Sequence, residues 1–198
     1  MKYAIVAIAI LAALFCRTFL VSVYKVSSQK MAPNILVGDF ILASKSTFGP
    51  KHGDLVVFNK NSQTFIKRVI AVGADEVEFV NGEYSINATK CNYTFSEKTA
   101  DESLSIYEEK CIDSARKIIR LEDINKTIKL SKIKLDKAQV LVANDFRTIE
   151  NDPNSAEMIS DDQIIGKPLF VWMSYSATQD FISKSLGIRW NRILTKLQ

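Results

Sequence analysis

The chain has 198 residues, enough for one folded domain with an anchor or an insertion, and its hydrophobic content of 47% is ample for a core. Its formal net charge is only +4, and the lysines and arginines are spread along the chain rather than clustered. A charge this weak and dispersed argues against nucleic-acid binding and suits a protein beside an anionic membrane. The sequence has no glycine-rich phosphate loop and no metal-ligand spacing, so we expect neither a cofactor nor a metal.

The N-terminal segment is apolar and uncharged from Tyr3 to Cys16, after which Arg17 interrupts it. A helix needs about 20 apolar residues to cross a bilayer. The range Tyr3–Tyr24 is just long enough if the side chain of Arg17 reaches the interface. We therefore predict a membrane anchor in residues 1–24, with the N-terminus in the cytoplasm because Lys2 and the amino group are positively charged.

Two alternatives to an uncleaved anchor fit this segment less well. A cleaved signal peptide would be short and apolar in the same way, but no small-x-small cleavage site follows the apolar run closely. A lipoprotein site at Cys16 would require a small residue at the position that the bulky Phe15 occupies.

Short apolar runs bounded by turn residues predict β-strands over much of the remaining chain. The strand candidates are residues 21–26, 39–43, 54–58, 64–71, 138–145 and 169–175. Asn81-Gly82 lies between two further apolar segments and predicts a hairpin at residues 77–87. We expect a β core made of residues 25–87 and 138–176.

Residues 88–137 are polar, rich in lysine and glutamate, and without regular periodicity. We predict that they form an inserted, smaller lobe. Cys91 and Cys111 both lie in it, and outside the cytoplasm they would form a disulfide. Such a disulfide would close a loop of about 20 residues and contribute about 3 kcal/mol in the chain-entropy model. Two unpaired thiols are the alternative.

Residues 177–198 place basic residues between apolar ones and predict a basic amphipathic tail. One interpretation is contact with the membrane surface, where Trp172 and Trp190 would suit the interface. The other interpretation is a helix packed on the β core.

The stretch that follows the anchor carries a specific motif. Residues 28–33 read Ser-Gln-Lys-Met-Ala-Pro, and Gly38-Asp39 follows shortly after. This stretch resembles the active-site box of the bacterial type I signal peptidases, which reads Ser-x-Ser-Met-x-Pro-Thr followed by Gly-Asp. The first serine, the methionine and the proline match without a gap, whereas the family's nucleophilic serine aligns with Lys30.

Two more segments extend the resemblance. Residues 65–70 match the family's apolar residue, lysine, arginine and valine-rich run, which places Lys67 on the catalytic lysine. Arg17-Thr18-Phe19 resembles the end of the family's anchor. The fold that the resemblance implies is mostly β: a signal-peptidase-type antiparallel β core with an inserted smaller lobe and one N-terminal transmembrane helix.

The resemblance also implies a chemistry. In the family, a serine hydroxyl attacks the scissile carbonyl while a buried, neutral lysine takes its proton. Lys67 would be this general base, and Ser28 would help to form the oxyanion site. Met31 and Pro33 would contact the substrate, an exported pre-protein bound as an extended strand with small side chains before the cut.

A lysine at position 30 changes that chemistry. A protonated amine is a poor nucleophile, and an amine that did attack would leave a stable amide. Two ammonium groups about 4 Å apart, at an effective dielectric near 20, repel each other by about 4 kcal/mol. Lys30 beside Lys67 therefore needs a nearby anion. In an extended chain, Ser28 and position 30 would share a face.

The resemblance places this anion in a second box, which in the family reads Gly-Asp-Asn-x-Asp-x-Ser-x-Asp-Ser-Arg. Asn144 takes the glycine position, and Asp145, Arg147 and Asp152 match structural residues of the box. Glu150 falls on the serine that orients the catalytic lysine. We expect Glu150 to neutralise one or both lysines, which would keep the general base protonated. A solvated Glu150, with the alignment shifted by one residue, is the alternative.

Together these features predict a signal peptidase I-like membrane protein of the protein-export pathway that has lost the Ser/Lys dyad. It would bind signal peptides or exported pre-proteins and contact membrane lipid. Its place would be the bacterial cytoplasmic membrane, crossed once, with the main domain outside. One alternative is an active peptidase with Ser28 as a displaced nucleophile and Lys67 as base. Another is a non-enzymatic component of a secretion or envelope complex.

Overall fold

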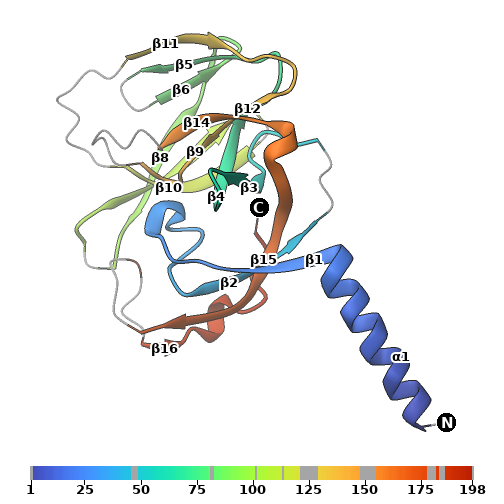
Figure 1. Ribbon diagram of the computed structural model, residues 1–198. Coiled ribbons are helices and arrows are strands. Elements are labelled where there is room, and N and C mark those ends of the chain that lie inside the picture. The colour runs from blue at the N-terminus through green and yellow to red at the C-terminus, as the bar shows by residue number, and fades with distance from the viewer. Residues whose placement is uncertain are drawn as a thin grey trace.

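The computed structural model describes residues 2–45, 49–80, 83–100, 102–112, 114–120, 129–147, 155–177, 182 and 186–197. Within them the protein is mostly β-strand and has few helical turns, which confirms the predicted class (Figure 1). Among the described strands, β10 and β13 pair in parallel and the other pairs are antiparallel. The strands are β1 (Val21–Lys25), β2 (Asp39–Ser44), β3 (Leu55–Lys60), β4 (Gln63–Ala71), β5 (Glu76–Val80), β6 (Glu83–Ile86), β7 (Thr89–Lys90), β8 (Asn92–Lys98), β9 (Ser105–Cys111), β10 (Ser114–Arg120), β11 (Lys129–Lys134), β12 (Gln139–Ala143), β13 (Phe146–Arg147), β14 (Ala156–Ser160), β15 (Ile164–Ser176) and β16 (Gly187–Ile188).

The N-terminal segment is a helix that stands apart from the sheets (Figure 1). α1 (Lys2–Phe15) continues into a π-helical turn (Cys16–Leu20). No helix in the described chain combines the length and the apolar character that crossing a bilayer requires. The helical segment also ends before residue 24, where the predicted anchor was expected to end, because Val21 begins β1. β1 then pairs along its whole length with β2.

The main sheet has eight strands, in the order β1-β2-β15-β3-β4-β12-β14 with β16 beside β15. β3 and β4 lie near its middle, and their apolar residues are buried without interruption from Leu55 to Phe58 and from Val69 to Ala71. Continuous burial of this kind indicates that both faces of these strands are covered. β4 is therefore held near the centre of the sheet, between β3 and β12.

The strands of the inserted region take part in two smaller sheets, with strand orders β11-β5-β6-β7 and β13-β10-β9-β8. The β5–β6 hairpin, which the sequence analysis placed in the core, belongs to a sheet that the insertion completes. The polar segment from β9 to β10 is an antiparallel hairpin whose Ile106, Ile118 and Ile119 are buried. These strands were not predicted, because charged residues occupy six of the fourteen positions of β9 and β10 and interrupt the apolar pattern.

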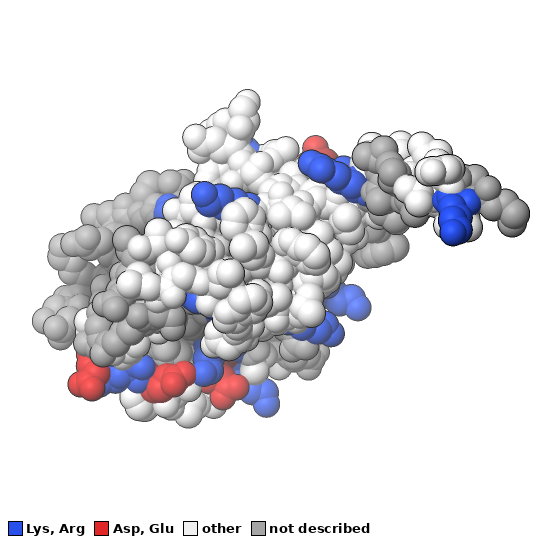
Figure 2. Space-filling view, turned by 90° about the horizontal axis from the view of Figure 1, so that it is seen from below, with Lys and Arg blue, Asp and Glu red and all other residues white. Residues whose placement is uncertain are grey.

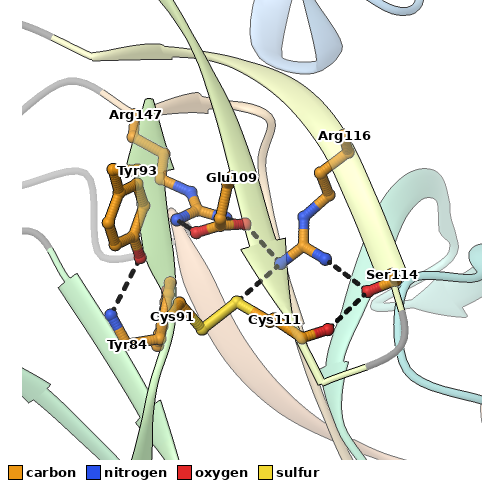
Figure 3. Close-up of a disulfide and its surroundings, with 8 residues drawn as sticks. All are labelled: Tyr84, Cys91, Tyr93, Glu109, Cys111, Ser114, Arg116 and Arg147. Atoms are coloured by element: carbon orange, nitrogen blue, oxygen red, sulfur yellow. Dashed lines mark hydrogen bonds and ion pairs between the residues drawn. A yellow bond between two sulfur atoms is a disulfide. The ribbon is translucent and has the colours of Figure 1, made fainter. Parts of the chain in front are cut away.

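Cys91 and Cys111 form a disulfide in this region (Figure 3). The buried Glu109 carboxylate lies nearby, forms an ion pair with Arg116, and accepts a hydrogen bond from Arg147 with 2.8 Å between Nη2 and Oε2. Burial by itself raises the pKa of Glu109, but the positive charges of the two arginines outweigh it and lower the pKa to about 2. Arg147 thus ties the second box to the insertion.

The C-terminal segment differs from the predicted amphipathic tail. Its described residues 186–197 form β16 and a 3-10 turn (Trp190–Arg192), and Leu197 is buried in the core. The side chains of Trp172 and Trp190 are exposed. Seen from below, the molecule presents a broad face with few charges, and most of its lysines and arginines lie toward the margin (Figure 2).

Candidate active site

A groove of about 160 Å³ lies between the chain that leaves β1 and the first half of β4. Ser28, Lys30, Met31 and Lys67, four residues singled out from the sequence, all line it. The described lining consists of residues 24–28, 30, 31, 35, 64–67 and 144. β1 and β4 are not neighbours in the sheet, so the groove exists only because the loop after β1 folds back towards β4.

Asp39 fixes the base of this loop. Its buried carboxylate accepts hydrogen bonds from the Leu36 amide at 2.8 Å, the Ser174 hydroxyl at 2.7 Å and Nη2 of Arg192 at 2.6 Å. Arg189 donates to the Ser174 hydroxyl at 2.7 Å. The sequence analysis assigned both arginines to a basic tail. No local pattern links residues that lie 150 or more positions apart.

Gly38 is required by the same loop closure. Its φ of +86° lies in the left-handed region that disfavours side chains. A Cβ atom there would overlap the carbonyl oxygen of Tyr175, whose amide donates to the Gly38 carbonyl at 3.0 Å. The Gly-Asp pair of the motif therefore closes the loop against β15.

Ser28 and Lys30 lie in a tight turn, not in the extended chain that the sequence analysis assumed. Gln29–Met31 is a 3-10 turn, and Ser28 caps it by accepting a hydrogen bond from the Lys30 amide at 3.3 Å. Lys30 is exposed, Met31 is buried, and Pro33 is half-buried. The turn still directs both Ser28 and Lys30 to the groove.

Lys67 is buried and already paired. Its side chain is 2% exposed, and its Nζ donates to Oε1 of Glu157 at 2.6 Å. Lys60 donates to the other oxygen of the same carboxylate. Burial raises the pKa of Glu157, but the hydrogen bonds from the two ammonium groups outweigh it and hold the pKa below its ordinary value. An ionised carboxylate in this position favours the ammonium form of Lys67.

The predicted anion was Glu150, not Glu157. Glu150, expected to neutralise Lys67, lies outside the described residues, as does Asp152. The carboxylate that the structure places on Lys67 belongs to Glu157, on β14. A hint was present in the sequence, because Glu157 lies between two apolar residues of a short strand-like run, but local pattern could not say which strand it would adjoin.

Asp145 contacts β4 on the face opposite to Lys67, through the neighbouring residue Arg68. Its buried carboxylate accepts hydrogen bonds from Nε and Nη2 of Arg68, both at 2.7 Å, and from the Asn34 amide at 2.7 Å. Arg68 also donates to the Gly53 carbonyl at 2.7 Å. This network joins β4, the loop between β1 and β2, and the second box. Asp145 is therefore in a position to stabilise the fold around the groove.

Asn144 precedes this aspartate and lines the groove. The side chain is 2% exposed, and its Oδ1 has no hydrogen-bond partner. Buried polar atoms without partners are rare in folded proteins. Among the described residues, no three His, Cys, Asp or Glu side chains are grouped as metal ligands.

Comparisons with known proteins agree with the motif. The sequence model of the family described as signal peptidase, peptidase S26, matches residues 1–173. Signal peptidase I from Aquifex aeolicus is 47% identical over 76 residues, which cover 35% of this chain and only 30% of that protein. Signal peptidase IB from Staphylococcus aureus is 26% identical over 167 residues, which cover 80% of this chain and 81% of that protein. Because the family model matches most of its length, the chain belongs to the signal peptidase family, peptidase S26.

Proposed function

We propose that this protein is a signal peptidase-like component of protein export that binds signal peptides but does not cleave them by the Ser/Lys mechanism. The observation that carries this proposal is the 2.6 Å contact between Nζ of Lys67 and the Glu157 carboxylate. A general base must be able to lose its proton, and a neighbouring carboxylate opposes that loss. The motif places Lys30 at the family's nucleophile position, where an amine that attacked a carbonyl would leave a stable amide.

Retention of peptide binding is supported by the strand edges that border the groove. The described pairing of β4 with β12 runs from Arg68 to Ala71, which leaves the first half of β4 paired with β3. β1 pairs with β2 and lies at the end of the sheet. An extended peptide can add to such edges through backbone hydrogen bonds. The family acts on pre-proteins that carry signal peptides, which are extended ligands of this kind.

Membrane attachment is part of the same proposal. α1 exposes apolar side chains such as Ile5 and Leu11, and Trp172 and Trp190 are exposed on the folded domain. Apolar and aromatic surfaces of this kind favour the membrane interface. The N-terminus would face the cytoplasm and the main domain would lie outside the bacterial cytoplasmic membrane. The full chain should float with liposomes, and equal flotation of a chain lacking residues 2–15 would contradict a role for α1.

The test of function is cleavage of a pre-protein with an Ala-x-Ala site, with the Staphylococcus aureus signal peptidase IB as positive control. We expect no cleavage by the wild type or by Lys30→Ser, because Glu157 still holds Lys67 protonated in both. We expect cleavage by the double variant Lys30→Ser/Glu157→Gln, which supplies a nucleophile and removes the carboxylate. Adding Lys67→Ala to the double variant should abolish that activity and serves as its control.

Ser28 is the alternative nucleophile, since it lines the same groove as Lys67. If the wild type cleaves the pre-protein, the proposal is wrong. Loss of that activity in Ser28→Ala, with retention in Lys30→Ala, would then assign the attack to Ser28. If the double variant does not cleave the pre-protein, the view that Glu157 and Lys30 together block catalysis is contradicted.

A further inference from the structure

We infer that the free edge of β14 binds an extended peptide segment of a partner protein, with a large apolar side chain of that segment in the cleft beside the edge. This site goes beyond the proposed function, because the cleft and the groove of the candidate active site share no described lining residue. Three features of β14 lead to this assignment: its unpaired backbone groups, the apolar cleft beside them, and the face to which its side chains point.

The first feature is the backbone of β14, which ends the main sheet and has β12 as its described neighbour. The Asn144 amide donates to the Ser155 carbonyl at 2.8 Å, and the Asp161 amide donates to the Ala138 carbonyl at 2.9 Å. Along an antiparallel pair, residues whose backbone groups face the partner alternate with residues whose groups face away. These two bonds and the register therefore direct towards β12 the backbone groups of residues 155, 157, 159 and 161.

The intervening residues Ala156, Met158 and Ser160 turn their backbone groups away from β12. The Ser160 amide shows this alternation directly, because it donates to Oε1 of Gln163 at 2.8 Å instead of to β12. In the described chain, the outward amide and carbonyl groups of Ala156 and Met158 have no hydrogen-bond partner. An unpaired edge of this kind is a template on which another strand can form backbone hydrogen bonds.

The second feature is a cleft of about 220 Å³ beside this edge. It lies between the β12–β14 end of the main sheet and the sheet that contains β5, β6 and β11, which lies above β14 in Figure 1. Val77 and Phe79 of β5 and Ile133 of β11 line one side, and Leu141 of β12 and Met158 line the other. An apolar cavity of about 150 Å³ accepts a ligand the size of benzene, so this cleft has room for a leucine or phenylalanine side chain.

The lining of the cleft selects an uncharged side chain. Glu157 is the one described lining residue with a charge, and its carboxylate already accepts hydrogen bonds from Lys60 and Lys67. A charged side chain that entered the cleft would lose its hydration without gaining a partner of its own. The part of the peptide that enters the cleft is therefore apolar.

The third feature is the direction of the side chains of β14. Residues two apart in a strand share a face, so Ala156 and Met158 both line the cleft, and the Met158 side chain is 48% exposed. A strand added to β14 would place every second side chain on the same face. An alkyl chain could fill the cleft but would make no hydrogen bond to the outward backbone groups, whereas an extended peptide fits both the cleft and the edge.

The test is fluorescence anisotropy with the full chain in lipid nanodiscs, because free detergent would compete for an apolar cleft. The probe is a labelled peptide of sequence Glu-Thr-Val-Thr-Leu-Thr-Lys, in which valine and leucine share one face of an extended strand. One control peptide has aspartate in place of the leucine. The other is N-methylated at the leucine and the preceding threonine, which removes backbone donors. We expect the first control to bind about tenfold more weakly than the probe and the second about fivefold more weakly.

Two substitutions in β14 separate the cleft from the edge. Met158→Lys places a charge at the cleft and should weaken binding about tenfold. Met173→Lys is the same change at a methionine that is 38% exposed on β15, outside the cleft lining, and should leave binding unchanged. Ala156→Pro removes an outward amide but keeps the bonds to β12, because an edge strand tolerates proline where the nitrogen faces away from its neighbour. It should weaken binding about fivefold. Thermal unfolding verifies that each variant is folded.

Four outcomes would overturn the inference. They are a wild type that does not bind the probe, equal binding of the aspartate peptide, equal binding of the N-methylated peptide, and unchanged affinity in Met158→Lys. Equal binding of the N-methylated peptide would reduce the site to a pocket for apolar groups without strand addition. Unchanged affinity in Met158→Lys would place the peptide elsewhere, the active-site groove included. If Ala156→Pro does not fold, the N-methylated peptide still tests the edge.

A second copy of this chain is the competing occupant. Sedimentation velocity would show it as association of the loaded nanodiscs that Met158→Lys abolishes, and this result would contradict a separate partner. We expect the wild type and Met158→Lys to sediment alike.

Discussion

Lys67 and Arg68 are consecutive residues of β4, and each places a buried cation against a carboxylate. Because side chains alternate along a strand, the two point to opposite faces of the sheet. Arg68 meets Asp145 through two hydrogen bonds of 2.7 Å, in a network that joins the active-site loop to the second box. Lys67 meets Glu157, which belongs to β14. One pair thus joins β4 to the second box, and the other joins β4 to β14.

The two pairs differ in how far the sequence predicted them. Asp145 matches an aspartate of the second box, so a structural role was expected at that position. Glu157 lies outside both boxes and reaches Lys67 from β14. The first pair therefore belongs to a motif, whereas the second depends on how the strands are arranged. Substitutions of Asp145, Glu109 and Glu157 should therefore differ in the stability that they remove.

Asp145→Ala should have the largest effect. Removing one partner of a buried ion pair leaves the other charge uncompensated, which costs about 3–5 kcal/mol. The free energy of unfolding from urea titration would measure this loss. Asn34→Ala is the matched control, because it removes a neutral partner of the same carboxylate and should cost about 1 kcal/mol. A loss below that of the control would contradict the structural role of the Arg68–Asp145 pair.

The Glu109 cluster gives an acid-dependent effect. Since the pKa of Glu109 is lowered to about 2, its stabilisation is complete above its unfolded pKa near 4.5 and is lost as the pH falls towards 2. The shift corresponds to about 3 kcal/mol at neutral pH. Urea titrations of the wild type and Glu109→Gln should differ by this amount at pH 7, and the difference should shrink as the pH falls below about 4.5 and close only near pH 2 or below. A constant difference across this range would contradict the ion-pair origin of the stabilisation.

Glu157→Gln should destabilise the fold less than the loss of Asp145 or Glu109, by about 1–2 kcal/mol, because glutamine still accepts a hydrogen bond from Lys67. Lys60→Gln removes the more exposed partner of the same carboxylate and should cost at most about 1 kcal/mol. Both values come from thermal or urea unfolding. If Glu157→Gln destabilised the protein as much as Asp145→Ala, the Lys67–Glu157 pair would be as important for stability as the Arg68–Asp145 pair. The proposed difference between the two faces of β4 would then be wrong.

Much of the site could be predicted because its parts are local motifs. The box around Lys30, the strand that carries Lys67 and the position of Asp145 are each readable within a few residues. The strands of the insertion were missed, since their charged residues conceal the alternation that burial imposes on β9 and β10. The partners of Asp39 were also missed, since Arg189 and Arg192 lie far along the chain and their basic character indicated a surface tail.

The family and the mostly-β class could be predicted from the ungapped motif and the short apolar runs, because both are local patterns. The contact between Lys67 and Glu157 could not be predicted, because it depends on how distant strands pair. Val142 of β12 pairs with Val69 on one side and with Glu157 on the other. This register brings together a lysine and a glutamate that are 90 residues apart. A slip of one residue would turn Glu157 to the opposite face, because the side-chain period of a strand is two. Strand register, which no local pattern encodes, therefore sets the charge state of the groove.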